Sequence, residues 1–111
     1  MKHVHYSKVE KEPVELEGAE GVTVRWAINE ADGAKNFAMR IFDVDPQGKT
    51  PYHEHDWEHE VFTLSGSGVV CVDGRDTPLI PGDVVFIPGG EKHNFQAGSE
   101  GLTFICLIPN Q

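Results

Sequence analysis

The sequence contains little cysteine, little positive charge and no long apolar run, and each shortage excludes a class of protein. Cys71 and Cys106 are the two cysteines among 111 residues, too few for a disulfide framework. The longest apolar stretch is much shorter than a membrane span, and the opening stretch MKHVHYSKVEKEPVE lacks the apolar segment of a signal peptide. We therefore expect a cytoplasmic protein with no membrane partner and with reduced cysteines.

Positive charge is the second shortage. Nine lysines and arginines face 18 aspartates and glutamates, which gives a formal net charge of −9. Such a surface repels phosphate backbones, so we expect no nucleic-acid partner. A chain of 111 residues fits a single domain, here residues 1–111, and can bury enough surface to fold without disulfide staples.

Helical periodicity is almost absent as well. Short β-rich runs alternate with turns that contain Gly, Pro or Asp-Gly, such as VDGR at 72–75. This pattern predicts an all-β sandwich or small barrel, preceded by a polar arm or edge strand over residues 1–20. The expected strands cover residues 21–28, 37–44, 60–66, 68–74, 83–88 and 101–109.

Histidine, in contrast, is concentrated in one place. His53, His55 and His59 fall within the stretch PYHEHDWEHE, residues 51–60. In an extended chain these three positions project to one face, whereas Glu60 projects to the other. Protonated imidazoles in one space would repel one another, and a divalent metal removes this problem by binding their neutral nitrogens. A solvated polar loop is the alternative that this cluster leaves open.

A fourth histidine lies in a separate segment. The stretch PGDVVFIPGGEKHNF, residues 81–95, places a strand between two glycine turns and ends close to His93. We expect this strand to bring His93 to the other three histidines from a distant part of the chain.

These two segments resemble the paired motifs of the cupins, which are written G-x5-H-x-H-x3,4-E-x6-G and G-x5-P-x-G-x2-H-x3-N. The second motif matches at Gly82, Pro88, Gly90 and His93, with Ala97 in place of the final Asn. The matching residues keep the spacing of the motif throughout.

The first motif matches at both histidines of its His-x-His pair and departs elsewhere. Gln47 occupies the place of the opening Gly, and His59 occupies the place of the metal-binding Glu. If Glu60 were that Glu, only five residues would separate it from Gly66, so the motif spacing agrees with strand parity in favouring His59.

The resemblance covers about residues 37–109 and implies a double-stranded β-helix, or jelly-roll, barrel. It also implies one divalent transition metal per chain, held by His53, His55, His59 and His93. Imidazole ligands suit Zn, Cu, Fe and Ni, and the resemblance adds Mn. Four protein ligands on an octahedral ion would leave two positions for water, a chelating oxygen ligand or dioxygen.

Three further residues are candidates for the pocket. The resemblance places Phe104 and Cys106 on the inner face of the last strand, beside the metal, although strand parity alone equally allows the alternate residues to face inward. Cys106 also fits an ordinary core cysteine. Arg40, in the otherwise apolar FAMRIF, is either an interior anchor for an anionic ligand or a surface charge.

The residues next to the histidines keep two interpretations each. Trp57 either caps the mouth of the site or packs at an interface. Glu58 and Glu60 either accept hydrogen bonds from imidazole N–H groups, and so orient the metal ligands, or are solvated surface charges.

Three functions fit this reading. The leading expectation is a metal-dependent enzyme, dioxygenase-like or acting as a Lewis acid, on a small oxygenated organic molecule. The second is a non-catalytic sensor that binds a small molecule or metal. The third is a metal-dependent lyase or isomerase, for which the sequence shows no second general base. We also expect a homodimer that pairs residues 4–9 or 21–28 with a second chain, because the edge strands of a small barrel need cover.

Overall fold

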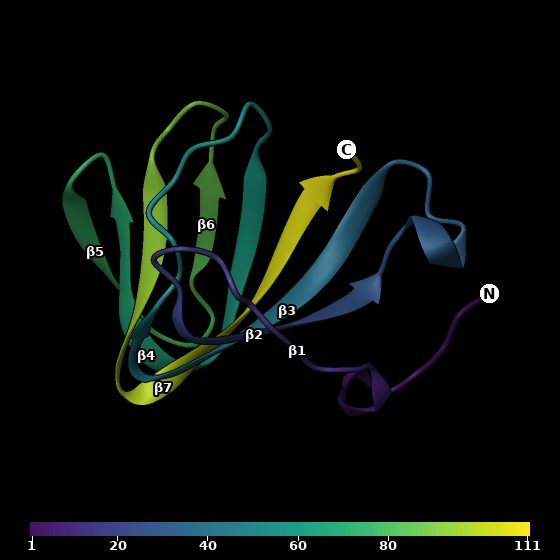
Figure 1. The fold of residues 1–111 in the computed structure, drawn as a ribbon, viewed down its shortest axis with the longest axis horizontal. Helices are drawn as coiled ribbons and strands as arrows, with labels where there is room; N and C mark the ends of the chain where they lie inside the picture. The colour runs from purple at the N-terminus through teal and green to yellow at the C-terminus, as the bar shows by residue number, and fades with distance from the viewer.

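Seven strands and two single-turn 3-10 helices are the regular elements of residues 1–111 in the computed structural model, which Figure 1 shows as a curved sheet. None of the helices is long or apolar enough to cross a membrane. The all-β fold predicted from the sequence is confirmed. In chain order the elements are η1 (Tyr6–Lys8), β1 (Glu12–Pro13), β2 (Glu20–Ile28), η2 (Glu30–Asp32), β3 (Phe37–Lys49), β4 (His59–Val72), β5 (Arg75–Leu79), β6 (Val84–Ile87) and β7 (His93–Pro109).

The strands form one continuous antiparallel sheet with the order β1-β2-β3-β7-β4-β5, and β6 also pairs with β4. The three long strands, β3, β4 and β7, carry the sheet through a sharp bend, so that its two halves face each other across the interior (Figure 1). One edge of β4 pairs with β7 along most of its length, and the other edge pairs first with β6 and then with β5.

The bend in β4 corrects one sequence-based expectation. Residues 60–66 and 68–74 were expected to form two strands, but residues 59–72 form the single strand β4, whose register with β7 shifts between Gly66 and Gly68. Gly66 has a φ of 82°, and a Cβ there would collide with the carbonyl oxygen of Gly101. A glycine is therefore required where the strand turns close against its neighbour, and it bends the strand without ending it.

The carboxy-terminal strands differ from expectation in the same way. β7 begins at His93, eight positions before the expected start, and β5 was not expected, since RDTPL is polar and contains Pro78. The Asp-Gly hairpin between β4 and β5 is confirmed, because Asp73 (φ 49°) and Gly74 (φ 81°) both adopt the left-handed conformation of a type I′ turn.

The inner face of the sheet carries a row of apolar and aromatic side chains. Phe42 on β3 is paired with Phe104 on β7, and their rings stack with centroids 5.2 Å apart. Phe104 also stacks on Phe95, at 4.4 Å. Arg40 and Cys106 form the next inward-facing pair of the same ladder, because inward positions recur at every second residue. This register places Arg40 and Cys106 beside the aromatic row in the barrel interior.

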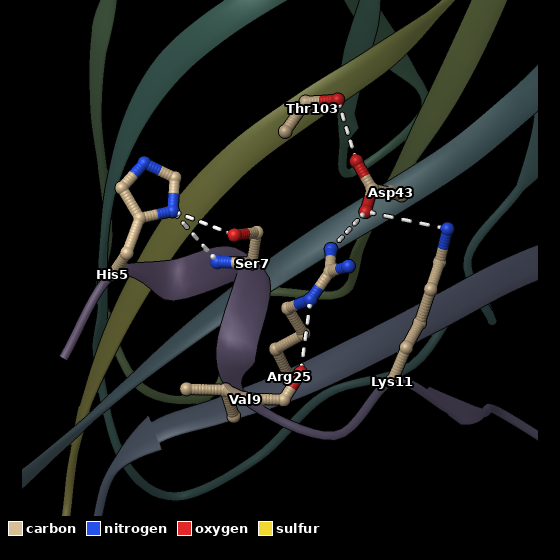
Figure 2. Close-up of polar contacts among 7 residues, drawn as sticks. All are labelled: His5, Ser7, Val9, Lys11, Arg25, Asp43 and Thr103. Carbon is tan, nitrogen blue, oxygen red and sulfur yellow. Dashed lines mark hydrogen bonds and ion pairs between the residues drawn. The ribbon is translucent and has the colours of Figure 1, made fainter.

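The amino-terminal arm is fastened to the outer face of the sheet by a polar cluster, which Figure 2 shows. Arg25 donates hydrogen bonds from Nε to the carbonyl oxygen of Val9 (3.2 Å) and from Nη1 to Oδ2 of Asp43 (3.1 Å). Thr103 donates to Oδ1 of the same carboxylate at 2.7 Å, and Lys11 Nζ lies 3.8 Å from Oδ2. Beyond this cluster the arm pairs with β2 as the short strand β1.

Candidate metal centre

The four histidines come from two separate segments of the chain. His53 and His55 lie in the connection between β3 and β4, His59 is the first residue of β4, and His93 is the first residue of β7. The backbones of His53 and His93 form an isolated bridge, in which each N–H donates to the other residue's carbonyl oxygen with N···O distances of 3.0 and 2.8 Å. His59 is held by its pairing with Ile87 on β6. The connection is thus fixed to β7 by backbone hydrogen bonds, and its side chains inherit that position.

The imidazole rings converge on one small space. One ring nitrogen from each of His53, His55 and His93 lies within 4.8 Å of the others. The two Nε2 atoms of His53 and His55 are 3.1 Å apart. His59 is outside the group of three, yet its ring centroid lies 4.7 Å from that of His93 and 5.2 Å from that of His55.

The second nitrogen of two of these rings is already engaged. Nδ1 of His93 lies 2.9 Å from the carbonyl oxygen of Glu91, so it carries the proton and leaves Nε2 with its lone pair. Nδ1 of His59 lies 3.3 Å from Sγ of Cys106, and its Nε2 is buried without any hydrogen-bond partner. A buried nitrogen with no partner is costly unless something binds it. A metal ion would satisfy it, because four imidazoles that each offer a lone pair form a suitable set of metal ligands.

Burial keeps these imidazoles neutral. Burial is the largest cause, and together with the positive charges of neighbouring histidines and Arg40 it lowers the pKa of His59 to about 3 and that of His53 to about 4. The pKa of His55 is lowered by the same burial, followed by the charges of His93 and Arg40. At pH 7 these rings are therefore in the neutral form that binds metal.

The cluster lies at the wall of a cavity in the barrel, about 320 Å³ in volume. All three pocket candidates from the sequence, Arg40, Phe104 and Cys106, line it together with the four histidines. Arg40 donates from Nη2 to Sγ of Cys106 at 3.1 Å, so this sulfur lies between the guanidinium and the His59 ring. Burial raises the pKa of the Cys106 thiol, and Arg40 opposes that rise.

The residues next to the histidines fall outside the cavity. Trp57 stacks on His55, with centroids 4.4 Å apart and planes 4° from parallel, and so supports one imidazole from behind. Glu58 and Glu60 are exposed and line a separate pocket, and neither accepts a hydrogen bond from an imidazole. Their role as imidazole partners is therefore not seen; Cys106 and the carbonyl oxygen of Glu91 occupy those positions.

Sequence reasoning missed the contribution of the arm. Residues 13–16 form part of the cavity wall, and they include Glu15, the only carboxylate that lines it. The alternation of Val14 and Leu16 with acidic residues in PVELEG was the only sequence signal for this segment.

Gln47 shows how the chain departs from the first motif without losing its geometry. Its φ of 64° is the left-handed conformation that glycine adopts most readily, so the backbone keeps a glycine-like turn before the histidine segment. The exposed amide side chain extends into solvent and leaves the connection to His53 unchanged in length.

Comparison with known proteins identifies the class of this barrel. A family model described as a cupin domain matches residues 40–108. The polyketide cyclase RemF from Streptomyces resistomycificus superposes with a TM-score of 0.94 at 39% identity, over 100% of this chain and 80% of that one. The chain belongs to the cupin family, and the predicted jelly-roll barrel is confirmed.

Two relatives with named activities match parts of the sequence. Dimethylsulfoniopropionate lyase DddW from Ruegeria pomeroyi is 32% identical in an alignment 102 residues long, which covers 86% of this chain and 67% of that protein. The 1-methylthio-D-xylulose 5-phosphate methylsulfurylase from Rhodospirillum rubrum is 35% identical over 71 residues, 63% of this chain. The match spans about half of that second protein, 46% of its length.

Proposed function

We propose that this cupin is an enzyme that holds one divalent transition metal on His53, His55, His59 and His93 and acts on a small oxygenated organic molecule in the adjoining cavity. The observation that carries the proposal is the convergence of neutral imidazoles on one space beside an apolar cavity. The unpartnered, buried Nε2 of His59 supports a fit to a metal ion. Imidazole sets of this kind suit Mn, Fe, Zn, Ni or Cu.

The chemistry follows from the charge of the ligand set. A divalent ion held by four neutral imidazoles keeps its full double charge and supplies a Lewis acid for an oxygen atom of the ligand. The chain supplies the rest: the Phe42, Phe95 and Phe104 wall excludes water, Arg40 provides a second positive charge, and Glu15 provides a carboxylate at the cavity wall. Together these groups can orient an oxygenated ligand and accept a proton from it.

A reaction without dioxygen is the branch that we favour. Two of the proteins that match this chain carry the names lyase and cyclase, and neither bond elimination nor ring closure has to consume oxygen. Glu15, an exposed carboxylate at the cavity wall, is a candidate for the general base that the sequence alone did not reveal for a lyase or isomerase. Dioxygenase-like chemistry is the competing outcome, and a sensor without turnover is the other.

The proposal is tested in two stages on protein purified without a histidine tag. Elemental analysis first measures metal content, with about one divalent ion per chain expected. The chain loaded with Zn under nitrogen and the chain loaded with Fe in air are then incubated with a panel led by dimethylsulfoniopropionate and 1-methylthio-D-xylulose 5-phosphate, and products are followed by mass spectrometry. Turnover by the Zn form without oxygen supports the proposal. Turnover only by the Fe form, with oxygen uptake, contradicts the favoured branch, and a protein that holds no metal contradicts the whole proposal.

We further propose that the protein is a homodimer. The nine-residue strand β2 is covered on its outer edge by only the two residues of β1, which leaves an open edge. A patch of large apolar side chains is also exposed on the outer face around β4 and β6, where Val84 is 75% and Phe86 57% exposed. Apolar patches on a soluble protein commonly mark an interface, and a second copy of the chain would cover them.

A further inference from the structure

Arg40 is a cation in the barrel interior without an anion to balance it. The three ion pairs of the chain involve Lys2, Lys11 and Arg25, and none involves Arg40. Its Nε atom is buried and has no hydrogen-bond partner, and its only hydrogen bond runs from Nη2 to the weak acceptor Sγ of Cys106. An interior guanidinium with an unused donor is costly to desolvate, and an anionic ligand would offset this cost.

The guanidinium is held in place by its neighbours. Its Cζ atom lies 4.9 Å from the ring centroid of Phe42 and 5.5 Å from that of Trp26. Both rings line the cavity together with Arg40, so aromatic faces support the planar group at the cavity wall. The chain therefore orients Arg40 without neutralising it.

Arg40 is also close to the histidine cluster. A single sulfur atom, Sγ of Cys106, lies between Nη2 of Arg40 (3.1 Å) and Nδ1 of His59 (3.3 Å). A ligand oxygen that reaches Arg40 would thus lie next to the imidazoles. Glu15, which is exposed, is the only carboxylate on the cavity wall, and most of the remaining lining is apolar or aromatic.

We propose that the cavity selects an organic anion, a compound with a planar apolar body and a carboxylate or enolate oxygen that Arg40 binds beside the histidine cluster. The apolar body packs against the Trp26, Phe42 and Phe104 side of the cavity. The inference rests on the proposed function for the location of the ligand, and it adds the charge of that ligand. Recognition by Arg40 does not need the metal, so the two proposals fail independently.

The test compares two probes of equal shape, 2-naphthoate and the neutral 2-naphthamide. Their dissociation constants are measured by calorimetry on protein freed of metal by a chelator, and again on protein loaded with Zn. We expect the metal-free wild type to bind naphthoate about tenfold or more tightly than naphthamide, the size of a charge-assisted hydrogen bond in a partly desolvated site. Arg40→Gln should abolish this preference, and Arg40→Lys should retain part of it.

Arg75→Gln is the matched control. Arg75 is exposed on β5 and does not line the cavity, so its loss removes the same charge from the chain without touching the proposed site. This variant should keep the wild-type preference for naphthoate, and circular dichroism checks the folding of every variant.

Three results would overturn the inference: equal affinity of the wild type for both probes, no naphthoate binding at millimolar concentration, or an unchanged preference in Arg40→Gln. The wild-type comparison remains decisive if an Arg40 variant fails to fold. If the wild type prefers naphthoate but binds no metal, the preference supports the anion site. The lack of metal then contradicts only the proposed metal enzyme.

Discussion

Acidification should destabilise the metal-free protein because the chain buries neutral histidines. In the folded state the pKa of His59 is lowered to about 3 and that of His53 to about 4, whereas in the unfolded chain both take the ordinary value of about 6.5. Between these limits the unfolded chain binds protons that the folded chain does not. Stability is therefore highest above pH 6.5, falls as the pH drops through 6.5, and stops falling below the folded pKa values.

The magnitude follows from this window. Consider a histidine that stays neutral in the folded state and titrates at the ordinary pKa in the unfolded chain. Its proton uptake in the unfolded chain, integrated from pH 7 to pH 5, is about 1.4 pH units, which lowers the free energy of unfolding by about 2 kcal/mol at about 1.36 kcal/mol per unit. His59 is only 5% exposed, so the full amount applies to it. His53 is half-buried, and solvent screening makes its share smaller, which gives about 2 to 4 kcal/mol for the pair. This loss is a large fraction of the free energy of unfolding of a typical domain, which is about 5–15 kcal/mol.

Urea unfolding of the metal-free protein at pH 7 and pH 5, followed by circular dichroism in the presence of a chelator, measures this loss. His59→Gln should lose about 2 kcal/mol less than the wild type over the same interval, because it removes one of the buried titrating groups. His3→Gln is the matched control, since His3 is exposed and should leave the pH dependence unchanged.

One result would refute the reasoning: a His59→Gln variant whose stability falls between pH 7 and pH 5 by as much as that of the wild type. The pH dependence would then come from other groups, and the burial of His59 would not be the cause of its low proton affinity.

Three further outcomes are expected. His93→Ala should empty the metal site in elemental analysis while Glu60→Gln keeps about one ion per chain; the reverse pattern would assign the ligand to the wrong residue. Cys106→Ala should weaken Zn binding by about tenfold, because the Nδ1 atom of His59 loses the partner that orients it; unchanged affinity would show that the contact is incidental. Light scattering should find a dimer that Phe86→Asp disrupts, and a wild-type species of only about 12 kDa would exclude it.

Much of the site was predictable because the relevant patterns are local. The spacing of His53, His55 and His59 depends on the alternation of side chains along an extended chain, and the structure shows His59 buried at the cavity and Glu60 exposed on the other face. The Asp-Gly turn at 73–74 was predictable for the same reason, since a type I′ turn needs only two adjacent residues.

Strand limits were less predictable because tertiary packing overrides local punctuation. Gly66 was interpreted as the end of a strand, since glycine commonly ends one, yet the close approach of Gly101 makes it a bend within β4. The polar sequence of β5 carries little strand signal of its own, and it pairs with β4 because the hairpin at Asp73 and Gly74 returns it there.

The sequence by itself determined the all-β class, the cupin motifs and the four histidines, because each depends on residue types at fixed short spacings. Only the tertiary structure decided which groups surround those histidines. The contact between Arg40 and Cys106 joins residues 66 positions apart, and it exists because the register of β3 against β7 pairs them. The arm is likewise held on the sheet by Arg25 and Asp43, which lie on two other strands. Strand register and long-range hydrogen bonds depend on how the whole sheet closes, so no local spacing encodes them.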